Sequence, residues 1–204
     1  MPVSCSRLPF TLLLLACVPG ALTAQDRRLA ERLDSSTAAG VQHLVDSARA
    51  AGLPSEPLVQ KALEGKTMGA SPARIQLAVE GLFGQLVSAR GALGRDATEA
   101  ELTAGAGALR AGLAPGSLRQ LHELRRDGSL AVPIAVLTDL VAEGVPADQA
   151  TRAVLELARN GRSDDDFVAL RKRVQTERRD GTAPRADPLP RPAPPPAADP
   201  PASP

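Results

Sequence analysis

Few residues in this 204-residue sequence have the chemistry of a catalytic or metal-binding group. The two histidines, His43 and His122, are 79 positions apart, and neither belongs to an HExxH pattern. Each has leucine or valine beside it, as expected for a histidine at the border of a packed helix face. We therefore predict structural roles for both, with no metal ion and no cofactor.

Enzyme motifs are missing from the sequence as well. It contains no GxSxG, no P-loop and no GxGxxG pattern. The prediction is accordingly a protein that is not an enzyme. A hydrolase that pairs a serine with His43 or His122 is the weaker alternative, and it predicts that replacing both histidines abolishes activity.

Two charged clusters follow one another late in the sequence. Asp164, Asp165 and Asp166 come directly after Ser163, and we interpret them as the first turn of a helix, where carboxylates offset its positive pole. A calcium loop would need oxygen ligands spread over about a dozen residues around a glycine, which this segment lacks. The second cluster is basic and is a candidate interaction patch: Arg171, Lys172, Arg173, Arg178 and Arg179.

The basic cluster has two interpretations. Cations at the C-terminus of a helix stabilise it, so a solvated helix face is the simpler one. Alternatively, the patch binds anionic lipid, lipopolysaccharide or an acidic partner, with an affinity that falls as the salt concentration rises.

The first 24 residues have the layout of a signal peptide. Arg7 precedes an apolar run over residues 10–18, and Pro19-Gly20 and small residues follow. The run is about nine residues long, far short of the roughly 20 that a membrane-spanning helix needs. Cleavage after Ala24 is therefore predicted to release a mature chain that begins at residue 25.

A second processing route starts from the cysteine in this segment. The residues Leu14-Leu15-Ala16-Cys17 resemble the lipobox of bacterial lipoproteins. The resemblance implies that Cys17 becomes a lipidated N-terminus and tethers the chain to a membrane. Both routes predict an exported protein, periplasmic or extracellular, in a bacterium, and both remain open.

Removal of this segment changes the composition of the chain. Cys5 and Cys17 are its only cysteines, so a chain cut after Ala24 contains no disulfide, and helix packing alone must stabilise it. Loss of Arg7 leaves 23 basic against 23 acidic residues. This formal neutrality argues against a general nucleic-acid binder. The mature sequence also lacks a span long and apolar enough to cross a membrane.

The composition, together with regularly spaced helix-start signals and glycines, predicts an all-α fold of short helices. There is no Trp or Tyr and only three Phe, so the core must be aliphatic. From residue 35 the chain repeats a helix-start signal, about a dozen residues with apolar positions three and four apart, and a glycine. Gly112, Gly128, Gly144 and Gly161 end such units at spacings of 16, 16 and 17 residues. A repeat-like stack and an irregular helical bundle are equally compatible with this pattern.

The same signals predict individual helices. We expect one over 55–65, with a serine N-cap and a terminal glycine, and a long one over 71–94. Thr98 and Glu101 have the spacing of a capping box. Within the long helix, Gly84, Ser88 and Ala92 lie four apart and form a small-residue stripe, which predicts close packing of another helix or a kink.

The domain organisation follows from these segments. We predict a signal peptide over 1–24, a short charged N-terminal segment over 25–34, a helical domain over 35–180 and a disordered Pro-rich tail over 181–204, which holds 10 of the 19 prolines. The expected role is a binding or scaffolding module of the cell envelope. A lipoprotein accessory subunit anchored through Cys17 is the alternative.

Overall fold

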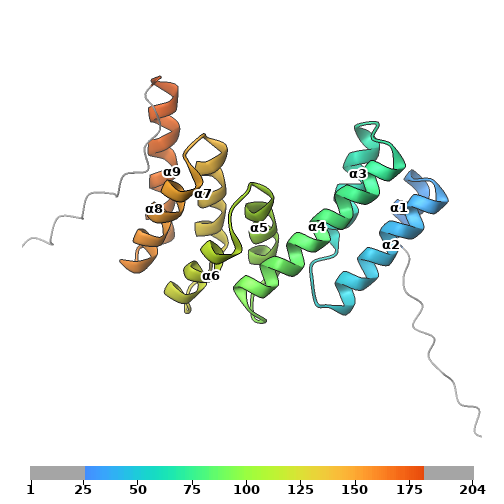
Figure 1. The fold of residues 1–204 in the computed structure, drawn as a ribbon, viewed down its shortest axis with the longest axis horizontal. Coiled ribbons are helices and arrows are strands. Elements are labelled where there is room, and N and C mark those ends of the chain that lie inside the picture. The colour runs from blue at the N-terminus through green and yellow to red at the C-terminus, as the bar shows by residue number, and fades with distance from the viewer. Residues whose placement is uncertain (1–25, 182–204) are drawn as a thin grey trace, which may run out of the picture.

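The chain is all-α over residues 26–181, the part that this computed structural model describes (Figure 1). No strand occurs in that part, which confirms the predicted fold class. The predicted signal peptide, Cys17 and the Pro-rich tail from residue 182 lie outside the described residues. The described helices are α1 (Arg27–Arg32), α2 (Ser35–Ala50), α3 (Glu56–Thr67), α4 (Pro72–Leu93), α5 (Glu99–Arg110), α6 (Pro115–Leu124), α7 (Ala131–Ala142), α8 (Ala147–Arg159) and α9 (Asp164–Arg179). None of these helices is long and apolar enough to cross a membrane.

Helices α4 to α9 form two adjacent rows. In one row α4 packs on α6 and α6 on α8, and in the other α5 packs on α7 and α7 on α9. Figure 1 shows α5, α7 and α9 side by side. Because each helix contacts the helix two places further along the chain, this part of the molecule is a repeat-like stack rather than an irregular bundle.

The charged segment before residue 35 contributes a helix to the same fold. Asp26 caps α1, because its Oδ1 accepts a hydrogen bond from the Arg28 N–H at 3.0 Å. Leu29 and Leu33 are both buried, and α1 packs against α2 and α3. The stack of helices therefore begins at α1.

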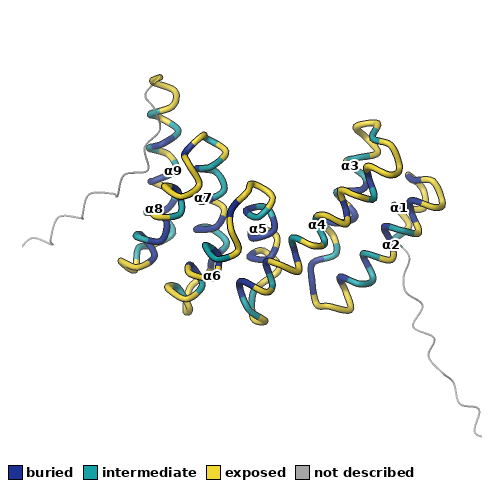
Figure 2. The backbone as a smooth tube through the Cα atoms, in the orientation of Figure 1, coloured by how far each residue is buried: buried dark blue, intermediate teal, exposed yellow. Residues whose placement is uncertain are grey.

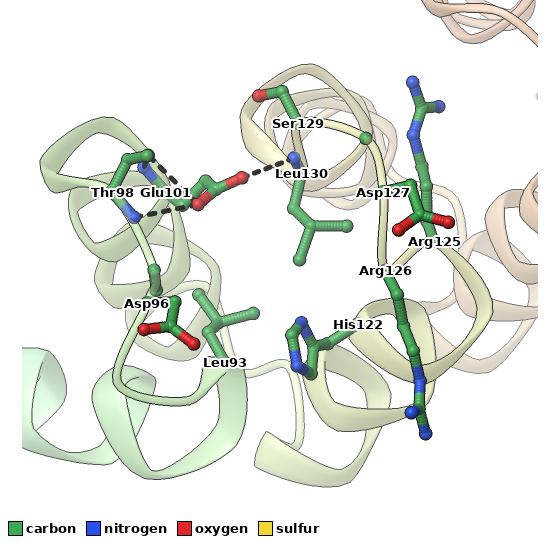
Figure 3. A pocket seen from close by; sticks show the side chains of 12 residues that line it. Leu93, Asp96, Thr98, Glu101, His122, Arg125, Arg126, Asp127, Ser129 and Leu130 are labelled. Carbon is green, nitrogen blue, oxygen red and sulfur yellow. Dashed lines mark hydrogen bonds between the residues drawn. The ribbon is translucent and has the colours of Figure 1, made fainter.

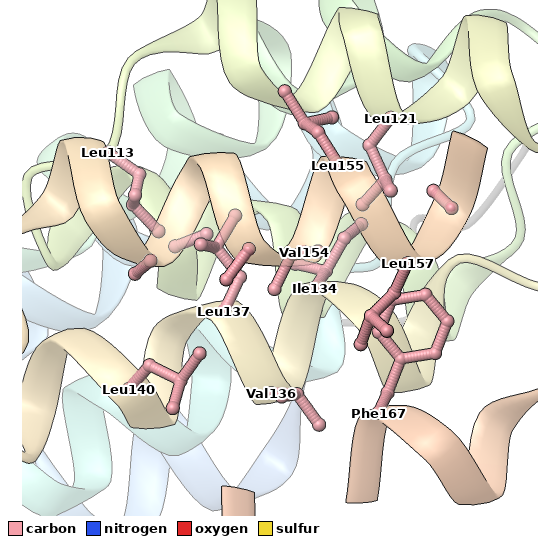
Figure 4. Close-up of a cluster of buried hydrophobic side chains, with 14 of the residues drawn as sticks. Leu113, Leu121, Ile134, Val136, Leu137, Leu140, Val154, Leu155, Leu157 and Phe167 are labelled. Atoms are coloured by element: carbon pink, nitrogen blue, oxygen red, sulfur yellow. The ribbon is translucent and has the colours of Figure 1, made fainter. Parts of the chain in front are cut away.

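Two aliphatic clusters make up the core, and α4 belongs to both. Val79 and Leu86 of α4 join the cluster of the N-terminal helices, whereas Leu93 joins the cluster that runs on to α9. Figure 2 shows buried positions alternating with exposed ones along each helix. Figure 4 shows the second cluster, in which Phe167 is the single buried aromatic residue of residues 26–181. Burial of each large aliphatic side chain contributes roughly 1.5–3 kcal/mol.

Within residues 26–181, five helices end in a turn that a glycine and the residue after it close together. After each of the five, a glycine adopts a left-handed φ between 63° and 92°, which a side chain would strain. The next residue donates its N–H back into the helix, as Val145 does to the Leu140 carbonyl at 3.0 Å. These five glycine-capped ends lie at Gly52, Gly69, Gly112, Gly144 and Gly161. The predicted helix stops at positions 112, 144 and 161 are thus confirmed.

Two other predicted stops are wrong. Helix α3 runs two residues past Gly65, whose role is to let α4 approach, because a Cβ there would lie 3.0 Å from Ile75 Cγ1. Helix α6 ends at Leu124, well before Gly128, which has no left-handed φ. A glycine of the repeated pattern therefore marks a helix end only where it adopts a left-handed φ and a backbone hydrogen bond closes the turn.

The small-residue stripe of α4 is packed at one end only. Gly84 and Ser88 are exposed, and a Cβ built on Gly84 would meet no atom within 4 Å, so the predicted close packing is wrong at these two positions, whereas Ala92 is buried in the core. Close approach occurs instead at Gly105 of α5, where a Cβ would lie 3.1 Å from the Cβ of Ala89 on α4. The glycine that brings these two helices together is thus on α5.

Candidate functional site

The loops that follow α4 and α6 frame a groove (Figure 3). Loop 94–98 lies on one side and loop 125–130 on the other, around a space of about 380 Å³. Its lining combines apolar residues with titratable ones from both loops. The side chains that line it belong to Leu93, Asp96, Ala97, Thr98, Glu101, His122, Arg125, Arg126, Asp127, Ser129 and Leu130.

Both loops depart from the glycine-capped pattern, and side chains hold them instead. Gly94 has a φ of 87° but a ψ of 176°, so the chain leaves α4 extended. The Arg90 guanidinium donates to the Arg95 carbonyl and to the Gly52 carbonyl, both at 2.6 Å. Loop 94–98 is thereby tied to the loop that follows α2.

Glu101 ties the two loops of the groove together. Its Oε2 accepts from the backbone N–H of Thr98 at 2.9 Å and from the Thr98 hydroxyl at 3.0 Å, which confirms the predicted capping box. Its Oε1 accepts from the N–H of Leu130, at the start of α7, at 2.7 Å. The side chain is 7% exposed, so one buried carboxylate caps α5 and holds the loop before α7.

The surroundings of Glu101 favour its ionised form. Burial works to raise the pKa of this carboxyl, but the hydrogen bonds from Leu130 and Thr98 and the nearby His122 outweigh it. The pKa of Glu101 therefore lies below its ordinary value of 4.5. The groove contains a built-in negative charge at neutral pH.

Arg125 connects loop 125–130 to the next unit of the stack. Its guanidinium donates to Asp164 Oδ1 at 2.6 Å and to the Arg162 carbonyl at 3.3 Å. The same group lies 5.2 Å from the centroid of the Phe167 ring, a cation–π contact. Arg125 is therefore a structural residue, although it borders the groove.

Four polar side chains of the groove have no hydrogen bond or ion pair within residues 26–181: Asp96, His122, Arg126 and Asp127. His122 is half-buried and the other three are exposed. In Figure 3 the His122 ring lies beside Leu93, between the two loops. Their polar atoms are available for further hydrogen bonds, although the Arg126 guanidinium points away from the space between the loops.

The two histidines are separated in the fold. His43 is exposed on α2, whereas His122 lies on α6 in the groove. No serine or threonine hydroxyl bonds to either ring in the described part of the chain. No group of acids, histidines or cysteines there has the arrangement of a metal site.

The acidic cluster begins α9, where it was predicted. Asp166 Oδ2 accepts from the backbone N–H of Ser163 at 3.0 Å and from its hydroxyl at 3.1 Å. Asp164 binds Arg125, whereas Asp165 is exposed. Two of the three carboxylates thus have structural contacts.

The structure pairs several cations of the predicted interaction patch with acids. Arg171 bonds to Asp139 at 2.9 Å and Arg178 to Glu143 at 2.5 Å, both on or next to α7. Arg173 faces Glu177 on the same helix at 3.8 Å. The two remaining members, Lys172 and Arg179, are exposed and form no ion pair within residues 26–181.

Sequence reasoning missed the groove because two loops 30 residues apart create it. The capping-box pattern identified Glu101 only as a helix cap, and the contact with Leu130 spans 29 positions. The one available signal was the lone His122 between leucines, which was interpreted as structural.

Comparison of the chain with known families, with curated proteins and with solved structures finds no match.

Proposed function

We propose that this chain is an exported, non-enzymatic helical module that binds a partner protein in the cell envelope, with the groove between loops 94–98 and 125–130 as the contact site. The observation that carries the proposal is the set of polar side chains in this groove that have no hydrogen bond or ion pair within residues 26–181. The loops that present them are fixed by Arg90, Glu101 and Arg125, so little ordering is required on binding.

Export is the second part of the proposal and rests on the first 24 residues. Their signal-peptide layout supports release of the chain from residue 25. The lipobox-like residues before Cys17 support the alternative of a membrane-tethered accessory subunit. An intact mass that starts at residue 25 would select release, and a diacylated mass that starts at Cys17 would select the tether.

In-cell crosslinking tests the binding role. A photoreactive amino acid at Arg126, on the exposed rim of the groove, should crosslink to one discrete partner that mass spectrometry identifies. The same amino acid at Lys66, exposed at the end of α3, is the matched control and should give no such product. The same products from both positions, or none from Arg126, would contradict a binding role for the groove.

A further inference from the structure

We infer that the groove receives a cationic side chain, arginine or lysine, from the partner, with its charged head at Asp96 and its apolar stem along Ala97 and the His122 ring. This inference rests on the proposed function and names the ligand chemistry of the same site.

The charges inside the groove favour a cation. Asp96 is exposed and has no ion pair in residues 26–181, and Glu101 adds a buried negative charge to the groove lining. The positive groups point elsewhere: Arg125 is bound to Asp164, and Figure 3 shows the guanidinium groups of Arg125 and Arg126 turned away from the space between the loops.

An anionic ligand fits the groove less well. Backbone N–H groups at helix N-termini are the usual attraction for anions, and here the N–H groups of Thr98 and Leu130 already bind Glu101. A second anion would therefore find these donors occupied and would face the carboxylates of Asp96 and Glu101.

The apolar part of the groove matches the stem of a basic side chain. Ala97 is partly exposed there, and the buried side chains of Leu93 and Leu130, 1% and 3% exposed, form the floor beneath it. Lysine and arginine carry three or four methylene groups that pack on such a surface while the head stays in contact with water. A small metal cation lacks this stem, so the apolar lining favours an organic cation.

His122 adds a flat surface at the same place. Its ring is half-buried, forms no side-chain hydrogen bond within residues 26–181, and lies beside Leu93 in Figure 3. A neutral imidazole offers a nitrogen acceptor, and a planar guanidinium can stack on the ring. Arginine can use both contacts, so we expect it to bind more tightly than lysine.

The histidine signals in an NMR spectrum test this inference directly, because the chain has only two histidines. The probe is N-acetyl-arginine amide, titrated into the full-length mature protein. The His122 ring signals should shift and saturate at roughly millimolar concentrations, as expected for one partly exposed ion pair with an apolar stem. The His43 signals are the internal control and should stay in place.

Two control ligands separate charge from shape. N-acetyl-citrulline amide has nearly the same shape without the charge and should bind about fivefold more weakly, the value of about 1 kcal/mol for one ion pair. N-acetyl-glutamate amide should leave His122 unchanged. Saturable shifts with the glutamate probe but not with the arginine probe would overturn the inference in favour of an anion site.

A pair of variants locates the charge. Asp96→Asn should weaken binding of the arginine probe about fivefold, whereas Asp165→Asn, which removes an exposed acid on α9, should have no effect. Unfolding midpoints equal to that of the wild type would show that both variants fold. Equal affinity in Asp96→Asn and the wild type would overturn the assignment of the head to Asp96.

The arginine-probe titration and the crosslinking experiment together distinguish a failure of this inference from a failure of the proposed function. If the arginine probe fails while the crosslinker at Arg126 captures a partner, the ligand class is wrong and the binding role stands. If the crosslinker captures nothing as well, the proposed function fails with it.

Discussion

Within residues 26–181, five helix ends close through a left-handed glycine and a backbone bond from the residue after it, whereas the two that frame the groove do not. At a glycine-capped end such as Gly144, a left-handed φ and a backbone bond across five residues complete the turn. Loops 94–98 and 125–130 lack this turn and rely on Arg90, Glu101 and Arg125, whose bonds reach across distant parts of the sequence.

The difference shows why polar side chains gather at these two loops. A glycine-capped turn satisfies its own backbone groups, so it is short and presents few side chains. The other two loops have their backbone groups satisfied by side chains of neighbouring units. Side chains at the groove, among them Asp96 and Arg126 of the loops and His122 of α6, form no hydrogen bond or ion pair within residues 26–181.

The largest expected effect comes from removing the carboxylate that joins the two loops. Glu101→Ala leaves the buried N–H of Leu130 and the N–H of Thr98 without acceptors, so the free energy of unfolding should fall by about 3 kcal/mol. Asp166→Ala removes a residue at the same position of the α9 cap, but with no contact to another loop, and should cost about 1 kcal/mol. Urea unfolding of both variants measures the difference, and equal losses would contradict the special role of Glu101.

The features that the sequence predicted correctly are those that depend on residues close together in the chain. The all-α fold, the Thr98–Glu101 cap and the helix ends before Gly112, Gly144 and Gly161 depend on residues a few positions apart, and the structure confirms each. Local propensity and capping chemistry are sufficient for such features.

What the sequence could not predict depends on distant contacts. Gly65 and Gly128 look like further helix stops, but Ile75 packs over the first, and a loop held by Arg125 contains the second. Glu101 also has a second partner 29 positions away, which no local pattern encodes. The groove was missed for that reason.

A second pair of variants tests the glycine-capped ends. Gly144 has a φ of 91°, so Gly144→Ala should lower the free energy of unfolding by about 1–2 kcal/mol. Gly84 lies in a helix with open space at its Cβ position, so Gly84→Ala should raise it by about 1 kcal/mol. Thermal unfolding midpoints that move in the same direction for both would contradict this account of the turn.

Removal of the Arg125 guanidinium, which holds loop 125–130, should have a smaller effect on the free energy of unfolding. Arg125→Met should lower the free energy of unfolding by about 1 kcal/mol, through loss of the Asp164 ion pair and of the contact with Phe167. Arg152→Met breaks an exposed ion pair with Asp148 on α8 and should change little. Indistinguishable values in urea unfolding would show that Arg125 does not hold loop 125–130.

The smallest expected effect is a dependence on pH. Because the pKa of Glu101 is lower in the folded chain than its ordinary 4.5, its ionised form stabilises the fold above that pH. This stabilisation should disappear as the pH falls below 4.5 and through the folded-state pKa. The difference in unfolding free energy between wild type and Glu101→Gln should therefore be constant near neutral pH and shrink in acid. A difference that grows in acid would contradict the lowered pKa of Glu101 in the folded chain.

Hydrogen exchange at the Leu130 amide tests the account most directly, because this N–H has no partner in its own helix and donates to Glu101 at 2.7 Å. We predict slow exchange in the wild type, comparable to the amide of Val145 at a glycine-capped end. In Glu101→Ala the Leu130 amide should become fast while the Val145 amide stays protected. Exchange of the wild-type Leu130 amide at the rate of the exposed Asp127 amide would contradict a buried link between the two loops.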